Sequence, residues 1–192
     1  YDVEEGTNPG FLYQQNTMRD AMLAATTLNI FHKHCDRVRM ANLAQTVNVL
    51  QAVILTDEEK MLLTPTYHVM EMYKVHQDAT LIPLELKCND YVQGNDKLPA
   101  ISASASRAES GELHLSVANI HATEAQDVTI DVEGAEVRVK SGRILTSKNL
   151  GDHNTFVKPD AVKPSTFTGA RVSRGRVTLK VPPFSVIVLT LE

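Results

Sequence analysis

The sequence predicts a mainly β protein in which an antiparallel β-sandwich follows a short helical region. Two observations predict this organisation. Apolar residues recur at helical spacing before about residue 80, and all six methionines lie there. After residue 80, short alternating runs are separated by Gly, Asn, Asp and Pro, which is typical of strands joined by turns. We therefore divide the chain into residues 1–79 and residues 80–192.

Two helices are predicted in residues 1–79. The segment Thr7–Gly10 is rich in turn residues, and Asn16 or Thr17 then caps a helix that ends near residues 35–36. A second helix fits residues 65–76, because a proline favours the first helical turn. The residues expected on the buried faces are Met18, Ala21, Met22, Ala25, Leu28 and Phe31 or His32 in the first helix, and Val69, Met72 and Tyr73 in the second.

Apolar runs lie between the two helices, at residues 38–44, 47–50 and 52–55. We expect one buried strand there, followed by a solvated turn at the charged residues 56–60. A helix, a buried strand, a loop and a second helix match the closing part of a parallel (β/α)8 barrel. Periodicity alone does not distinguish this arrangement from a small α/β layer.

Eight strands are predicted after residue 80. Several alternate cleanly, as in Leu113, Leu115 and Val117, so each is expected to turn one apolar face inward and one polar face outward. This pattern favours an antiparallel sandwich or jelly roll, with residues 148–168 as a long surface excursion. The predicted strands are residues 81–87, 100–107, 112–119, 127–132, 136–140, 143–147, 174–181 and 185–191.

Composition excludes several classes of protein. The chain has 192 residues, is 43% hydrophobic and 22% charged, and is expected to be globular. A formal charge of -4 gives no basic surface for nucleic acid, and no apolar run is long enough to span a membrane. The N-terminus has no signal-peptide pattern and no Met, so we expect a mature or excised piece. Cys35 and Cys88 could form a disulfide, but two reduced thiols of a cytoplasmic protein are favoured.

The histidines give no pattern of a metal site. His32 and His34 are two apart and point to different faces of a helix. His68 and His76 share a face but lie about 12 Å apart along the helix. We interpret these histidines as unmatched polar side chains.

Acidic residues give no pattern of a catalytic pair. Glu4–Glu5 and Glu58–Glu59 are adjacent in sequence, so their carboxylates diverge instead of converging on one bond. We interpret them as solvated charges. The sequence also has no Gly-rich phosphate loop, nucleophile elbow or paired-cysteine motif. No metal and no cofactor are expected.

Three amides, Asn42, Gln45 and Asn48, are the polar residues of an otherwise apolar segment. Neutral amides at the end of a core strand can hydrogen-bond a neutral polyol such as a sugar without the desolvation cost of a charge. The alternative is that they satisfy loop backbone, and the pattern alone favours that alternative.

Four stretches of the chain carry a family resemblance. They are residues 6–21, 28–31, 34–51 and 64–73, which include the run Met40-Ala41-Asn42-Leu43-Ala44-Gln45. They resemble glycoside hydrolase family 51, the intracellular α-L-arabinofuranosidases. Beyond residue 80 the resemblance rests on the expected sandwich and on the closing run Pro182-Pro183-Phe184-Ser185-Val186.

The resemblance implies a (β/α)8 catalytic barrel followed by a jelly-roll-like sandwich. A complete barrel takes about 250 residues, so this chain would hold the C-terminal end of the barrel in residues 1–79 and the β-sandwich domain in residues 80–192. Family members remove terminal non-reducing α-L-arabinofuranosyl residues from arabinan and arabinoxylan oligosaccharides with retention, using two glutamates. Both glutamates would lie upstream of this chain, so no catalytic residue is expected here and the fragment alone is expected to be inactive.

The resemblance also implies substrate-binding residues and partners. Gln45 matches a family glutamine that hydrogen-bonds the arabinose, whereas Asn42 matches the motif without an assigned sugar contact. The implied partners are an arabinofuranosyl oligosaccharide substrate, the rest of the catalytic barrel and, in the full enzyme, further copies of the protein.

Two other functions stay open from the sequence. The sandwich could be a structural or oligomerisation module, which is compatible with every pattern above. It could also be a carbohydrate-binding module, but such surfaces usually present aromatic rings to sugars. The chain has no Trp, and its aromatic residues after residue 80 are Tyr91, Phe156, Phe167 and Phe184.

Overall fold

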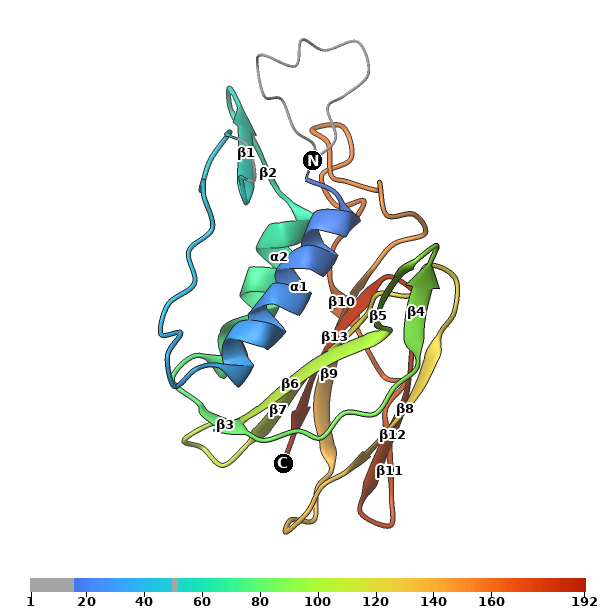
Figure 1. Cartoon of the computed structure of the whole chain (residues 1–192). Coiled ribbons are helices and arrows are strands. Elements are labelled where there is room, and N and C mark those ends of the chain that lie inside the picture. The colour runs from blue at the N-terminus through green and yellow to red at the C-terminus, as the bar shows by residue number, and fades with distance from the viewer. Residues whose placement is uncertain (1–15, 50–51) are drawn as a thin grey trace.

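A computed structural model describes residues 16–49 and 52–192 (Figure 1). The helices are α1 (Met18–Lys33), α2 (Pro65–Tyr73) and a short 3-10 helix, η2 (Lys74–His76). Both predicted helices are confirmed, and α2 with η2 fills the predicted range. Thr17 is the N-cap of α1, where its backbone N–H donates to Asp20 Oδ2 at 2.7 Å. The predicted turn at residues 7–10 and the pair Glu4–Glu5 lie outside the described residues.

The region between the helices differs from the prediction. Residues 38–49 form no strand, and the first strand there is β1 (Ile54–Asp57), which pairs with β2 (Lys60–Leu63) in an antiparallel hairpin. The turn was predicted at residues 56–60, but it consists only of Glu58 and Glu59 at the centre of the hairpin. Glu58 has a φ of 52°. The charged residues around them tolerate strand structure because this hairpin is largely exposed.

The second half of the chain is an antiparallel sandwich, as predicted (Figure 1). One sheet has six strands in the order β10-β9-β13-β7-β6-β3, and the other has three in the order β11-β12-β8. The bounds are β3 (Thr80–Ile82), β6 (Ile101–Arg107), β7 (Leu113–Asn119), β8 (Gln126–Asp131), β9 (Val139–Thr146), β10 (Ser165–Thr166), β11 (Arg171–Ser173), β12 (Arg176–Val181) and β13 (Ser185–Leu191).

Three strand predictions need correction. Residues 136–140 and 143–147 do not form separate strands, because β9 is continuous from residue 139 through residue 146 and residues 136–138 lie outside it. The predicted strand at residues 81–87 is shorter, since β3 ends before Pro83, which cannot donate to a ladder. An additional hairpin pairs β4 (Asp90–Gln93) with β5 (Asp96–Pro99). Its residues are mostly exposed and lack the alternation that would have predicted it.

The first core lies between the two sheets, where alternate residues of facing strands meet. Its buried members include Leu115 and Val117 of β7, Val177 and Leu179 of β12, and Ile187 and Leu189 of β13. Their alternation confirms the inward apolar face that the sequence predicts. Each such side chain contributes about 1.5–3 kcal/mol when fully buried.

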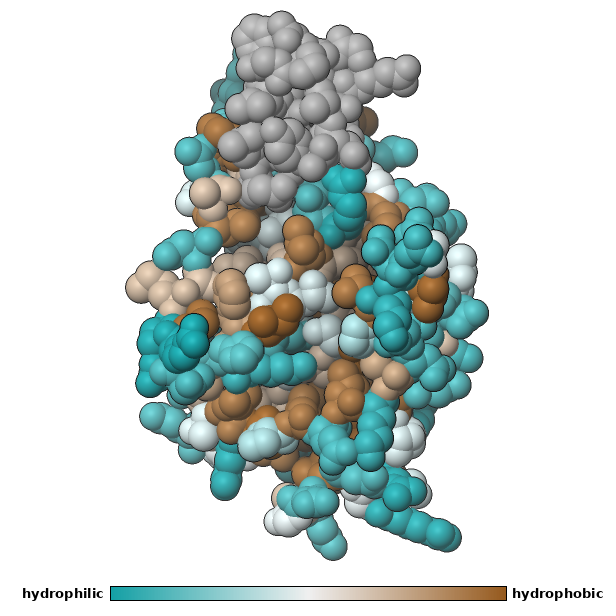
Figure 2. Space-filling model, viewed as in Figure 1, coloured by the Kyte–Doolittle hydropathy of each residue, from teal (hydrophilic) through white to brown (hydrophobic). Residues whose placement is uncertain are grey.

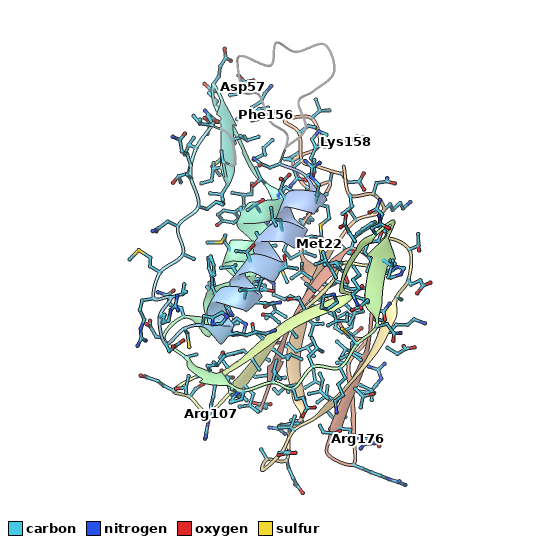
Figure 3. All side chains as sticks on the ribbon, viewed as in Figure 1. Met22, Asp57, Arg107, Phe156, Lys158 and Arg176 are labelled. Atoms are coloured by element: carbon cyan, nitrogen blue, oxygen red, sulfur yellow. The ribbon has the colours of Figure 1, made fainter. Side chains whose placement is uncertain are left out.

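The second core lies between the helices and the opposite face of the six-stranded sheet. Met18 and Met22 of α1 and Val69 and Met72 of α2 pack against Ala118, Leu145, Val186 and Val188. Met22 lies on the side of α1 that faces the sheet (Figure 3). The polar face of β6 and β7 is therefore covered by helices and not by solvent, in contrast to the prediction. A division into domains at residues 79 and 80 stays a prediction.

The segment at residues 148–168 fastens these layers together. Its backbone carbonyls at Leu150 and Asp152 accept from the Arg19 and Met18 N–H groups at 3.0 and 2.9 Å. These N–H groups belong to the first turn of α1 and have no partner inside the helix. Buried Asn154 donates to Leu63 O at 2.8 Å and to Val162 O at 2.9 Å, and accepts from Val162 N at 2.7 Å. The predicted surface excursion is thus partly buried.

No helix in residues 16–49 and 52–192 is long and apolar enough to cross a membrane.

Asn154→Ala is expected to lower the free energy of unfolding by about 2–4 kcal/mol, because it removes three hydrogen bonds and leaves the buried Val162 N–H unpaired. Urea unfolding followed by circular dichroism would measure the loss. Asn95→Ala, at an exposed turn, is the control and should change stability by less than about 0.5 kcal/mol. Equal stability of the two variants would contradict the role assigned to Asn154.

Candidate functional site

The predicted substrate-binding residues lie on the segment that joins α1 to β1. The chain leaves α1 through a turn in which Val38 N donates to His34 O at 2.8 Å. Asn42 and Gln45 follow, both exposed, and neither side chain has a hydrogen-bond partner within the described residues. The expectation that they sit in a buried setting is wrong for this chain. Their apolar neighbour Met40 is itself 75% exposed.

Asn48 anchors the end of this segment to the β1–β2 hairpin. Its side chain accepts from Thr56 N and donates to Thr56 Oγ1, both at 2.7 Å. Its backbone N–H donates to Ile54 O at 3.1 Å, and Ile54 N donates to Thr46 O at 3.0 Å. The φ of Asn48 is 59°, a left-handed conformation that Asn tolerates better than most residues. The alternative that these amides satisfy loop backbone therefore holds for Asn48.

Gln45 has a different environment from Asn48. The peptide bond that precedes it, from Ala44, is cis. The hydrogen bonds of Thr46 and Asn48 hold the backbone on one side of Gln45 without using its side chain. A free primary amide offers two donors and an acceptor, which suits a sugar hydroxyl. It does not ionise near neutral pH, so this position can bind a sugar but cannot act as an acid or base.

The described acidic pair gives no reason to assign an acid or base to this segment. Glu58 and Glu59 occupy the turn of the β1–β2 hairpin and are exposed, as predicted. Asp57 lies beside them at the tip of that hairpin, far from Arg176 at the opposite end of the sandwich (Figure 3). Among the described residues, no group of three or more His, Cys, Asp and Glu side chains could hold a metal ion. Cys35 and Cys88 are free thiols, as favoured from the sequence.

The interpretation of His32 and His76 as unmatched is wrong. Their ring centroids lie 4.7 Å apart, because α1 brings one and η2 the other to the same place on the sheet. Both rings are hydrogen-bonded to serines of the sheet. The sequence does contain an indication of this contact, because serines alternate along β6 at Ser102, Ser104 and Ser106. The prediction placed that polar face in solvent and therefore gave these serines no partner.

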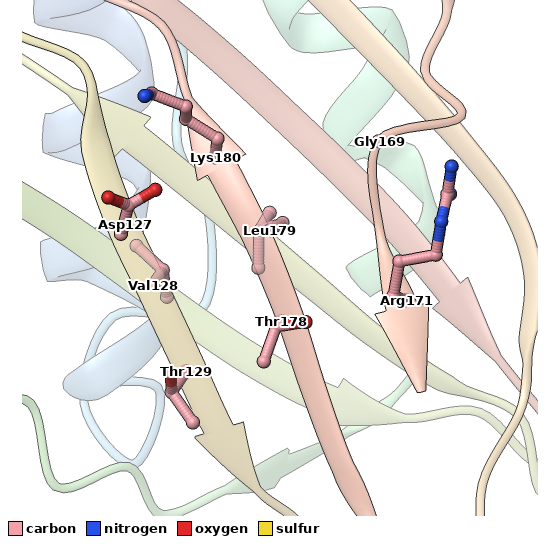
Figure 4. Close-up of a pocket in the computed structure, with 8 residues that line it drawn as sticks. All are labelled: Asp127, Val128, Thr129, Gly169, Arg171, Thr178, Leu179 and Lys180. Atoms are coloured by element: carbon pink, nitrogen blue, oxygen red, sulfur yellow. The ribbon is translucent and has the colours of Figure 1, made fainter. Parts of the chain in front are cut away.

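A shallow groove on the three-stranded sheet tests the carbohydrate-binding alternative (Figure 4). Lys180 and Asp127 are cross-strand partners on its floor, and Arg171 of β11 lies at its side. The residues that line the groove are Asp127, Val128, Thr129, Gly169, Arg171, Thr178, Leu179 and Lys180. None is aromatic, so the groove lacks the flat apolar surface on which sugar rings stack.

The chain is similar in sequence to known arabinofuranosidases. The α-L-arabinofuranosidase C-terminal domain family matches residues 1–185. An intracellular exo-α-L-arabinofuranosidase of Bacteroides ovatus is 47% identical over 193 aligned residues, which cover 100% of this chain and 38% of the relative. An intracellular exo-α-(1→5)-L-arabinofuranosidase of Bifidobacterium longum is 26% identical over 94% of this chain and 33% of its own length.

Solved structures agree with these relatives. The family 51 arabinofuranosidase from Xanthomonas axonopodis pv. citri is 46% identical with a TM-score of 0.95, over 100% of this chain and 39% of that one. The arabinose complex of the Thermotoga maritima α-L-arabinofuranosidase is 26% identical with a TM-score of 0.84, over 99% of this chain and 40% of that one. The chain thus spans about two fifths of these proteins, and its fold and sequence follow theirs from end to end. It belongs to the α-L-arabinofuranosidase C-terminal domain family.

Proposed function

We propose that this chain is the C-terminal portion of an α-L-arabinofuranosidase. The complete enzyme hydrolyses terminal non-reducing α-L-arabinofuranosyl residues of arabinan and arabinoxylan oligosaccharides with retention. This portion supplies a sugar-binding amide and a structural sandwich, whereas both catalytic glutamates belong to the rest of the barrel. The family match over residues 1–185 is the observation that carries the proposal.

The environment of Gln45 supports its role in holding the sugar. The amide is exposed and has no partner among the described residues, while the backbone next to it is tied to the β1–β2 hairpin. A binding group that is held by its neighbours and has an open side chain loses little order when a ligand binds. Asn42, three residues earlier, is exposed in the same segment but lies farther from these anchors.

Exposed apolar side chains of α1 and β2 support a barrel partner. Leu23 and Ile30 of α1 are 66% and 53% exposed, and Met61 of β2 is 62% exposed. Figure 2 shows apolar side chains at the surface on the face that carries α1. Soluble proteins rarely leave contiguous apolar surface uncovered. The remaining elements of the barrel would cover it.

The reaction itself requires groups from outside this chain. In a retaining enzyme one carboxylate attacks the anomeric carbon and a second protonates the leaving oxygen, and water then releases the sugar. Within this scheme Gln45 orients the arabinose by a hydrogen bond to a hydroxyl. The word "intracellular" in the names of two relatives supports a cytoplasmic location, and further copies of the protein would assemble in the full enzyme.

The purified 192-residue chain is expected to have no measurable activity on 4-nitrophenyl α-L-arabinofuranoside, because the proposal assigns both of the carboxylates that the reaction requires to the rest of the barrel. Release of nitrophenol would be followed by absorbance. The Bacteroides ovatus relative, assayed at the same concentration, shows that the conditions support turnover. Turnover by the isolated chain above the uncatalysed rate would refute the assignment of both glutamates to the rest of the barrel.

Gln45→Ala is expected to lower kcat/KM by about tenfold to a hundredfold, because a lost hydrogen bond to a bound sugar costs about 1–3 kcal/mol. The assay uses a fusion in which this chain replaces the 193 residues that it matches in the Bacteroides ovatus enzyme. Gln93→Ala, at an exposed position of β4, is the matched control. If both substitutions leave kcat/KM alike, Gln45 does not contact the sugar.

A further inference from the structure

Three imidazoles meet where the helices lie on the six-stranded sheet. His32 is at the end of α1, His76 is in η2 and His114 is on β7. The ring centroids of His32 and His76 are 4.7 Å apart, and those of His76 and His114 are 6.3 Å apart. Figure 1 shows α1 and α2 side by side across this face of the sheet. We call these three residues the histidine seam.

Serine hydroxyls bind both nitrogens of the central imidazole. His76 Nδ1 lies 2.7 Å from Ser106 Oγ, and His76 Nε2 lies 2.6 Å from Ser116 Oγ. A neutral imidazole has one donor and one acceptor. It therefore accepts a hydrogen bond from one serine hydroxyl and donates its N–H to the other serine. A protonated imidazole has two donors and no acceptor. Both serines would then have to turn their hydroxyls and accept, and the buried charge would lie beside two further imidazoles.

The first imidazole is joined to the helix and the sheet by a similar chain of hydrogen bonds. Ser104 Oγ donates to Asn29 Oδ1 at 2.9 Å, and its oxygen therefore accepts from His32 Nδ1 at 2.9 Å. Asn29 is fully buried and also accepts from the Tyr73 hydroxyl at 3.1 Å. Helices and sheet are thus joined by a continuous set of neutral hydrogen bonds.

No carboxylate of the described residues offsets a charge at the centre of the seam. The titratable groups that act on His76 are His32 from α1 and His114 from β7, and Tyr73 of α2 contacts its ring at 5.7 Å. The serines of β6 and β7 that touch it are neutral. Glu112 acts on His114 and not on His76, and it is paired with Lys140 at the outer end of the sheet.

Burial and the two neighbouring imidazoles lower the pKa of His76 to about 3. Burial also lowers the pKa of His32 and of His114, where Glu112 opposes the effect. Their ordinary value in an unfolded chain is about 6.5. Protons therefore bind more weakly when the helices are docked than when they are released. Docking is at full strength above pH 6.5 and weakens as the pH falls from 6.5 toward 3.

We propose that the histidine seam is an acid-sensitive latch, which holds α1 and α2 on the sandwich while its imidazoles are neutral and releases them when they are protonated. Release would move the segment at residues 38–49, which is joined to the end of α1 by the turn at residues 34–37. The latch does not depend on the proposed sugar contact of Gln45.

Hydrogen exchange of the 192-residue chain tests the latch. Between pH 7.5 and pH 5, the opening constant of amides in α1 and α2 should rise about 30-fold from His76 alone, after correction for the intrinsic exchange rate. Amides of β7 and β13 should stay protected over this range. His76→Gln, which keeps a neutral hydrogen-bonding side chain, should remove most of the rise. His34→Gln, at an exposed histidine outside the seam, should retain it.

A histidine NMR titration keeps the test decisive if His76→Gln does not fold. With ¹³C at Cε1, the folded wild-type chain should give a His76 signal that does not titrate between pH 8 and pH 5. A His76 signal with its midpoint near pH 6.5 would overturn the latch. So would the same pH-dependent opening in His76→Gln and wild type, or a simultaneous loss of protection in the helices and in β7 and β13.

Discussion

The architecture depends on covering both faces of the six-stranded sheet. β13 is apolar at nearly every position, so Val186 and Val188 emerge on one face and Ile187 and Leu189 on the other. A strand of this kind requires an apolar layer on each side. The three-stranded sheet supplies one layer and the helix pair supplies the other. The helices therefore belong to the same packed structure as the sandwich, although the sequence changes its period between them.

The helix-facing surface of this sheet has an apolar part and a polar part, and the two parts contribute differently to the docking of the helices. Towards β13 and β9 the contact is made by Val186, Val188 and Leu145, as in an ordinary core. Towards β6 the same surface carries serines, which reach Asn29, His32 and His76 of the helical layer. Apolar contact is tolerant of small shifts, whereas paired donors and acceptors fix one alignment. The serine side of the sheet thus sets how the helices lie on it, and the valine side supplies most of the burial.

Local patterns predicted the elements whose signals are complete within a short stretch. The capping residue Thr17 and the proline at residue 65 predicted the helix starts, and alternation predicted β7 and β12. The hairpins at residues 54–63 and 90–99 were not predicted. A largely exposed hairpin needs no buried face, so its sequence need not alternate between apolar and polar residues. The histidine seam was not predicted either, for a different reason. His32 and His76 come from different helices, and neither helix alone indicates that the two rings meet.

The candidate site shows the same limit. The resemblance selected Gln45, with Asn42 beside it, whereas the contact that occupies Asn48 came only from the structure. The Asn48 side chain is hydrogen-bonded to Thr56. Gln45 is therefore the amide that lies near a hydrogen-bonded part of the segment and is itself exposed to solvent. The chain that carries it leaves α1 at Lys33, the residue after His32. The docking of that helix on the serines of the sheet fixes one end of this segment, and the hydrogen bonds of Thr46 and Asn48 to the β1–β2 hairpin hold the other end. The position of Gln45, and with it the sugar contact that we propose, therefore depends on the hairpin as well as on the contact between helix and sheet.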